Sequence, residues 1–364
     1  MEKFKFNLNF KFFNKWVGNS RGNKYSRNHV LLDPSDEAFW KYSFHEMGIY
    51  DIPACLDYIL KINKITKKVI YIGHSQGGTS ILSGMSENYN YFKENLLLVV
   101  LLAPASKIDR FDSYFLDFLQ KIDLDDEFKK HKINEVLPFN PDLIDLNLRL
   151  SKFYPTIFYA FLELTSDEVS SVNCPDRVKV YFSHSPSGTS RQSITHFKQI
   201  INSGKFQKFD FGKEENIKIY GKETQPEYDL DLIKEIPIIL CGGLNDKITQ
   251  IKDIRWLRDQ LKKNNKIFFT YYEFEMMGHT SFMLNSNITW FNFVLQDIYK
   301  IMKMEGLIKE NIISSKFNDN KSKQKDNDTD IYRNTDTNAI DNSHTYTPMP
   351  LNSEENIIKE IHLK

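Results

Sequence analysis

The sequence predicts an α/β fold built on a mostly parallel sheet, and three observations support this class. Short apolar runs rich in β-branched residues alternate with helical patterns over residues 67–106, which is the strand–helix–strand order of a parallel unit. The same alternation returns over residues 236–302. Between these stretches the pattern breaks into helical pieces and turn-rich segments, which indicates an insertion.

Composition limits the class of protein further. The chain has 364 residues, of which 41% are hydrophobic, so it is long enough to bury a large core. Lysine plus arginine equal aspartate plus glutamate at 48 each, so no long-range field steers the chain onto nucleic acid or an anionic membrane. The three cysteines, Cys55, Cys174 and Cys241, are far apart and lack CxxC spacing, which argues against a disulfide scaffold and a structural zinc site.

The first third of the chain supplies strands and helices in a clear order. Phenylalanine and leucine alternate with polar residues over positions 4–12, which predicts a strand with one buried face. Residues 43–63 have helical spacing, and Pro53 is tolerated there if Asp51 caps a new first turn. Residues 67–75 then predict an apolar strand, 76–88 a helix entered through glycines, and 95–106 a buried strand.

After the insertion, the pattern predicts a strand ending in glycines at 236–246, a helix at 251–263, a strand at 267–274 and a helix at 288–302. Beyond about residue 314 apolar residues almost disappear, so that segment cannot offset its ordering entropy. We therefore expect a core formed by residues 1–106 and 234–313, a helical cap at 107–233, and a disordered tail at 314–364.

The stretch Gly73-His74-Ser75-Gln76-Gly77 fits G-x-S-x-G between a predicted strand and a predicted helix. A strand-to-helix turn of this kind holds the serine in a strained conformation with its Oγ exposed. The backbone N–H of Gln76 then points at a developing oxyanion, assisted by the helix N-terminus. We predict Ser75 as a nucleophile and Gln76 as a backbone oxyanion donor; the alternative is a glycine-rich turn without chemistry.

A serine nucleophile needs a base, and the base needs an orienting carboxylate. Asp246 follows one predicted strand and His279 follows the next, in the chain order serine, acid, histidine. We predict these two residues as acid and base. Asp246 could instead be a turn or N-cap residue, with Asp253 as a competing acid, and His279 could be a solvated loop residue.

With these residues in place, the chain resembles the acid lipase family of α/β-hydrolases, which includes gastric and lysosomal acid lipases and related steryl ester and triacylglycerol lipases. The resemblance extends from about Trp16 to about Ile298. It is carried by segments that include "WVGNSRGNKYSRNH", "VIYIGHSQGGT", "LLAPAS" and "VYFSHSPSGTSRQSITHFKQIINSGKFQKFDFG". It implies an α/β-hydrolase fold with an inserted cap, and it matches Ser75, Asp246 and His279 to the family's triad and Gln76 to its oxyanion residue.

The resemblance implies a carboxylic ester hydrolase, a lipase or steryl esterase of lipid degradation, that uses an acyl-enzyme and no cofactor. The expected partner is a lipid ester substrate, with transient contact at a lipid droplet or membrane surface allowed and no nucleic acid. His184 and His196 lack an HExxH motif or a carboxylate cluster, so we predict packing roles and no metal site. The alternative is a catalytically impaired relative that acts as a lipid-binding or interaction module.

The sequence departs from the family at its start. The family places a His-Gly-Leu segment, which supplies a second oxyanion N–H, upstream of the counterpart of "GNSRGN"; no His-Gly pair occurs in this sequence. We therefore expect a truncated or reduced member with an impaired oxyanion hole. The sequence shows neither a signal peptide nor a membrane span. Family members are often secreted, lysosomal or lipid-droplet associated, but without the family's signal peptide the resemblance implies no compartment.

Overall fold

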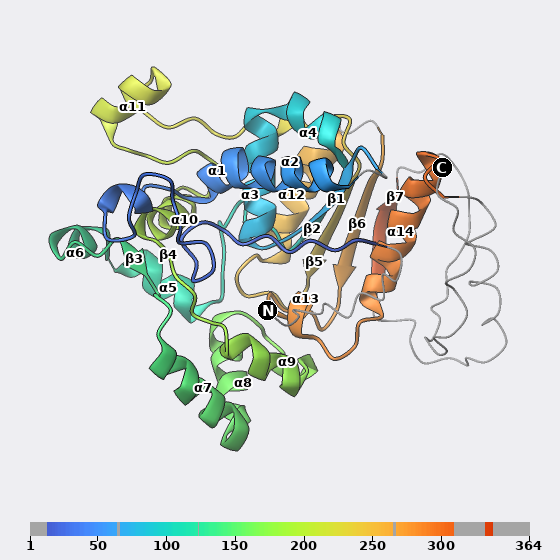
Figure 1. Cartoon of the computed structure of the whole chain (residues 1–364). Helices are drawn as coiled ribbons and strands as arrows, with labels where there is room; N and C mark the ends of the chain where they lie inside the picture. The colour runs from blue at the N-terminus through green and yellow to red at the C-terminus, as the bar shows by residue number, and fades with distance from the viewer. Residues whose placement is uncertain (1–12, 64–65, 123, 265–266, 309–331, 338–364) are drawn as a thin grey trace.

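The computed structural model describes residues 13–63, 66–122, 124–264, 267–308 and 332–337. Its centre is a five-stranded sheet with the order β1-β2-β5-β6-β7 (Figure 1). The strands are β1 (Val69–His74), β2 (Leu96–Leu102), β5 (Ile238–Gly243), β6 (Phe269–Phe274) and β7 (Tyr332–Thr337). The first four are parallel to one another and β7 is antiparallel to β6, which confirms the predicted mostly parallel sheet.

Strand β2 is buried along its whole length, so its side chains alternate between two apolar cores. On one face Val99 and Leu101 belong to the core formed with α3 (Gln76–Glu87) and α12 (Ile251–Asn264). On the other face Leu98 and Val100 belong to the core formed with α14 (Trp290–Met304). Figure 1 shows α3 and α12 on one side of the strands and α14 on the other, so the sheet lies between two helical layers.

The helix predicted over residues 43–63 forms, but Asp51 does not cap a new turn within it. The segment runs through α1 (Phe44–Glu46), a π-helical stretch η2 (Met47–Asp51) and α2 (Ile52–Ile62). Asp51 has helical backbone angles, and its carboxylate accepts hydrogen bonds from Arg21 instead. The N–H of Ile52 bonds to the carbonyl of Met47, five residues back, so the wider π-turn accommodates Pro53, which has no N–H to donate.

The two ends of the chain lie partly outside the described residues. The strand predicted over residues 4–12 lies outside them, as do residues 314–331 and 338–364 of the predicted tail. Within that tail, β7 pairs with β6. This pairing gives partners to backbone groups of β6 that would otherwise form a sheet edge.

The residues between β2 and β5 form the predicted helical insertion. It contains α5 (Tyr114–Lys121), α6 (Leu124–Lys130), α7 (Pro141–Phe153), α8 (Pro155–Thr165), η3 (Ser170–Val172), α9 (Pro175–Phe182), α10 (Arg191–Ser203), α11 (Lys213–Tyr220) and η4 (Leu230–Leu232). A two-stranded ladder joins β3 (Glu135–Val136) to β4 (Thr189–Ser190). The other elements are η1 (Glu37–Trp40), α4 (Tyr89–Asn95) and α13 (Ser281–Leu284). Among the described helices, none has the length and hydrophobicity that crossing a bilayer requires.

Candidate active site

Ser75 occupies the single position between the end of β1 and the start of α3. Its φ of 52° and ψ of −119° form a strained conformation, as the G-x-S-x-G turn predicts. The N–H of Ser75 bonds to the carbonyl of Leu102 at 3.0 Å, which fixes the turn to the neighbouring strand. Gly73 is required here, because a Cβ at that position would lie 2.7 Å from the carbonyl carbon of Gly77. The backbone at Gly73 thus passes close to that at Gly77, and the side chain of Ser75 is half-buried at the carboxyl edge of the sheet.

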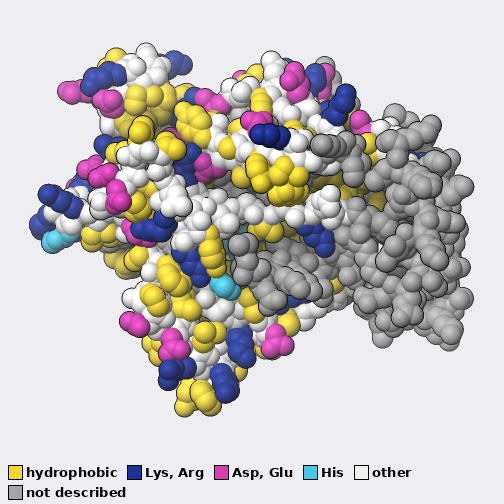
Figure 2. Space-filling view, in the orientation of Figure 1, with side chains coloured by type: hydrophobic (Ala, Val, Ile, Leu, Met, Phe, Trp, Pro, Cys, Tyr) yellow, Lys and Arg dark blue, Asp and Glu magenta, His cyan; other side chains and the backbone are white. Residues whose placement is uncertain are grey.

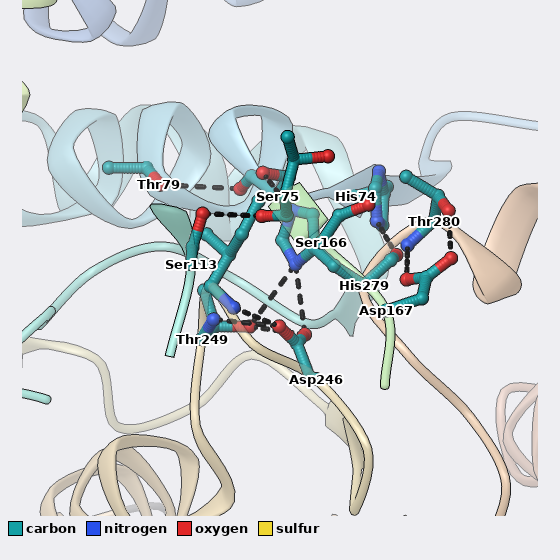
Figure 3. A network of polar contacts seen from close by, with 12 residues as sticks. His74, Ser75, Thr79, Ser113, Ser166, Asp167, Asp246, Thr249, His279 and Thr280 are labelled. Atoms are coloured by element: carbon teal, nitrogen blue, oxygen red, sulfur yellow. Dashed lines mark hydrogen bonds and ion pairs between the residues drawn. The ribbon is translucent and has the colours of Figure 1, made fainter. Parts of the chain in front are cut away.

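His279 lies in the loop between β6 and α13 and reaches Ser75 from the adjacent part of that edge (Figure 3). Its Nε2 atom is 2.7 Å from Oγ of Ser75. Its Nδ1 atom is 2.9 Å from Oδ2 of Asp246. The structure thus brings together the three residues that the sequence singles out as nucleophile, base and acid.

Asp246 follows β5 and is buried, and both of its carboxylate oxygens are held by hydrogen bonds. Oδ1 accepts the N–H groups of Ile248 and Thr249 at 2.8 Å each. Oδ2 accepts the hydroxyl of Thr249 at 2.7 Å as well as the ring of His279. The competing acid, Asp253, accepts the N–H of Asp109 at 3.1 Å. Asp246 is therefore the carboxylate that orients His279.

Electrostatics separate the two histidines next to Ser75. Burial lowers the pKa of His279, but the charge of Asp246, its hydrogen bond and the charge of Asp167 outweigh that effect, so the pKa stands above its usual value. Burial and the neighbouring His279 lower the pKa of His74 to about 3. His74 is therefore neutral, and its Nε2–H donates to the carbonyl of His279 at 2.8 Å. Of these two histidines, His279 has the geometry and the basicity that a general base needs.

Gln76 is the first residue of α3, so its amide precedes the hydrogen-bond ladder of that helix. The amide follows Ser75 directly, and a twelve-residue helix extends behind it. A helix N-terminus of this kind favours negative charge. The side-chain amide of Gln76 donates to Sδ of Met47 at 3.0 Å. The backbone N–H of Gln76 is therefore the group next to the serine.

The two insertion histidines weighed as metal ligands from the sequence have other partners. His196 is buried, stacks on Phe44 with ring centroids 4.0 Å apart, and donates from Nε2 to the carbonyl of Gln207 at 2.9 Å. His184 lies beside Lys24, whose N–H bonds to the carbonyl of Ser187 at 3.0 Å. The "GNSRGNK" and "SHSPSGTS" segments are therefore in contact. Within the described part of the chain, no three His, Cys, Asp or Glu side chains are grouped to hold a metal ion.

Sequence reasoning missed residues that hold the triad in place. The N–H and the hydroxyl of Thr249 both donate to the carboxylate of Asp246. A threonine three residues after an aspartate that starts an Asx turn is the signal that could have identified it. Ser166 and Asp167, which contact the loop of His279, lie in a turn-rich part of the insertion. Nothing in their local sequence indicates a contact with residues more than 100 positions away.

The chain is similar in sequence to proteins of known family. Residues 4–286 match a family model described as alpha/beta hydrolase fold. Lipase 1 of Drosophila melanogaster is 31% identical over 252 residues, covering 68% of this chain and 55% of that protein. The gastric triacylglycerol lipase of Rattus norvegicus is 32% identical over 269 residues, covering 68% and 63%. Lipase member K of Mus musculus is 30% identical over 286 residues, covering 76% and 68%.

The chain spans 55% of the Drosophila protein and 63% of the rat protein, which is less than two thirds of either length.

Proposed function

Because the chain belongs to the alpha/beta hydrolase fold family, with relatives at about 30% identity in the acid lipase family, we propose that it is a serine hydrolase that cleaves lipid esters through an acyl-enzyme. The observation that carries the proposal is the continuous hydrogen-bonded chain from Oγ of Ser75 through His279 to Asp246. A hydroxyl bonded to a buried, carboxylate-oriented imidazole is the arrangement that activates a serine.

In the first half of the reaction, Oγ of Ser75 attacks the ester carbonyl while Nε2 of His279 takes the hydroxyl proton. Asp246 accepts from Nδ1, so the ring has the tautomer that leaves Nε2 free to accept. The resulting oxyanion lies beside the amide of Gln76 at the positive end of α3. His279 then gives the proton to the leaving alcohol, the C–O bond breaks, and the acyl group stays on Ser75.

The second half repeats these steps with water. His279 takes a proton from a water molecule, whose oxygen attacks the acyl carbonyl. Collapse of the second tetrahedral intermediate releases the carboxylic acid as the proton returns to Oγ of Ser75. Atoms balance with ester and water as the only substrates.

The substrate class that we propose is a lipid ester. It is supported by the names of the relatives and by apolar side chains exposed on α7 and α8 of the insertion. These are Leu143, Leu146, Leu148, Phe153, Ile157, Phe161 and Leu164, together with Tyr154 between the two helices. Figure 2 shows hydrophobic side chains at the surface in this lower part of the molecule. Triacylglycerols and steryl esters are the ester classes we propose.

The test is hydrolysis of a short, soluble p-nitrophenyl ester by the wild-type chain, Ser75→Ala and Ser151→Ala. Ser151 is a matched control, because it is also partly buried and its hydroxyl only bonds to the carbonyl of Leu148 within α7. We expect turnover by the wild type and Ser151→Ala and none by Ser75→Ala. Equal turnover by all three would contradict the proposal, and no turnover by the wild type would favour the non-catalytic, lipid-binding alternative.

A further inference from the structure

A short segment of the insertion, residues 166–168, lies between the loop that carries Asp246 and the loop that carries His279. On one side Glu168 donates its N–H to the carbonyl of Asn245 at 2.9 Å, and Lys247 donates to the carbonyl of Ser166 at 3.1 Å. On the other side the N–H of His279 donates to the same Ser166 carbonyl at 3.3 Å. The insertion therefore links the two loops at the level of the triad.

At the centre of this segment, Asp167 is completely buried and its carboxylate faces the loop of His279 (Figure 3). Oδ1 accepts the N–H of Thr280 at 2.8 Å, and Oδ2 accepts the Thr280 hydroxyl and the Asn173 side-chain amide, the latter at 3.0 Å. A Cβ at Gly278 would lie 2.3 Å from Oδ1, so only glycine fits there. The carboxylate thus contacts the residues immediately before and after His279.

The backbone of His279 is consequently held on both sides. Its N–H is bonded to Ser166, its carbonyl accepts from Nε2 of His74, and the next residue is bonded to Asp167. These contacts come from the insertion and from β1, while Asp246 holds the ring itself. Since the ring position follows from the backbone, removing the Asp167 contact frees the loop that aims Nε2 at Ser75.

Asp167 also affects the charge of the site. Among the described residues, no lysine or arginine forms an ion pair with Asp167. Burying a charged carboxylate without such a partner costs free energy of folding. Burial raises its pKa, and hydrogen bonds from Thr280 and Asn173 oppose that rise. The titratable groups that face His279 are Asp246 on the β5 loop, Asp167 on the insertion and His74 on β1. Protonated His279 is thus the cation that Asp167 can stabilise.

We propose that Asp167 is a positioning residue for His279: its carboxylate fixes the Gly278–Thr280 loop and ties the inserted segment to the general base. The proposal rests on the proposed function in that it assigns His279 the role of base. It makes Asp167 a second carboxylate that acts on the imidazole, by holding the loop and by its charge rather than by a bond to the ring nitrogen.

The first experiment measures the rate of fluorophosphonate labelling for the wild type, Asp167→Ala, Asp167→Asn and Asp297→Asn. Asp297→Asn is the matched control. Asp297 lies on α14, its carboxylate accepts the hydroxyl of Tyr272 at 2.7 Å, and burial raises its pKa. We expect Asp167→Ala to label roughly ten- to a hundredfold more slowly, because a small misplacement of the base is costly. We expect Asp167→Asn to recover most of that rate, since its amide oxygen can still accept the N–H of Thr280. Its NH2 group would replace the oxygen that now accepts from Asn173, and it can donate to Oδ1 of Asn173, which has no partner among the described atoms, once that amide turns over.

The second experiment separates this inference from the proposed function. The pKa of His279 is measured by NMR titration of Cε1-labelled histidine in the wild type, Asp167→Asn and Asp297→Asn, assigned with His279→Gln. We expect the pKa of His279 to fall in Asp167→Asn and to stay unchanged in Asp297→Asn. An unchanged pKa in Asp167→Asn, or wild-type labelling by Asp167→Ala, would overturn the inference. An unlabelled wild type would count against the proposed function alone, because the titration still decides the role of Asp167.

Discussion

Nε2 of His279 lies 2.7 Å from Oγ of Ser75, although the two residues are 204 positions apart in the chain. The parallel sheet explains this distance. Ser75 follows β1 and His279 follows β6, and both strands end at the same edge of the sheet with β2 and β5 between them. The geometry of the site therefore depends on strand order, on the turn at Ser75 and on the loops that aim Asp246 and His279.

The turn at Ser75 stores backbone strain, and a pair of substitutions measures it. Glycine tolerates a φ of 52° while alanine does not, and both remove Oγ. We expect Ser75→Gly to be more stable than Ser75→Ala by about 1 kcal/mol, after allowance for the extra entropy of glycine in the unfolded chain. Urea unfolding of the two variants checks this, and equal midpoints would show that the turn is unstrained.

The hydrogen bond between Asp246 and His279 determines how activity depends on pH. A general base must be neutral, so activity falls as the pH drops through the pKa of His279, which lies above its usual value. Asp246→Asn removes the charge and the hydrogen bond that raise this pKa. We expect the acidic limb of kcat/KM to move to lower pH, and kcat to fall by a factor on the order of 10⁴.

Asp253→Asn is the control for this prediction, since Asp253 is also a buried carboxylate near the start of α12 but binds Asp109. It should keep the wild-type pH profile. A matching loss of activity in both variants would indicate a general effect of removing buried charge and not the action of a triad acid.

The two glycines of the G-x-S-x-G turn should differ in their tolerance of alanine. A Cβ at Gly73 would collide with the backbone of Gly77 at 2.7 Å, whereas a Cβ at Gly77 would lie 3.6 Å from the Tyr71 hydroxyl. We expect Gly73→Ala to lower the free energy of unfolding by about 1–3 kcal/mol through overpacking. Gly77→Ala should change it by less than about 1 kcal/mol. Chemical denaturation of both variants tests the difference, and an equal cost would contradict the packing of this turn.

The exposed apolar side chains of α7 and α8 should matter only with an aggregated substrate. Phe153 and Ile157 have more than half of their surface exposed. Changing both to serine should weaken hydrolysis of emulsified triacylglycerol at least about tenfold, because each loses apolar area that could enter a lipid surface. Hydrolysis of a soluble ester should not change.

The matched control is Ile217→Ser with Ile219→Ser on α11, which are exposed to a similar degree and lie on the opposite side of the insertion (Figure 1). A similar loss in both pairs on the emulsion would mean that general surface hydrophobicity, and not the α7–α8 face, supports activity on lipid.

Much of the candidate site follows from local sequence. Ser75 lies in a motif whose strand and helix have their own periodicities, and Asp246 and His279 follow apolar strands in a fixed chain order. These are short-range signals, so they can be interpreted without knowing the tertiary structure. The short apolar runs between helical patterns likewise predict β1, β2, β5 and β6.

Other features depend on contacts between distant segments. Asp51 has the sequence of a helix cap, but Arg21 binds it and a π-turn accommodates Pro53. Asp167 gains its role only because the insertion folds back between two loops of the core. Tertiary contacts of this kind override local preference, and periodicity carries no information about them.

The central claim is that Ser75 is a nucleophile activated by His279, and the most direct test is peptide mapping by mass spectrometry after reaction with a fluorophosphonate. The probe phosphonylates a serine whose proton is taken by a base. The hydrogen bond of 2.7 Å between Oγ and Nε2 predicts a single adduct on Ser75 in the wild type and no adduct at that position in His279→Ala. An unmodified Ser75 in the wild type, or equal modification in His279→Ala, would contradict the claim.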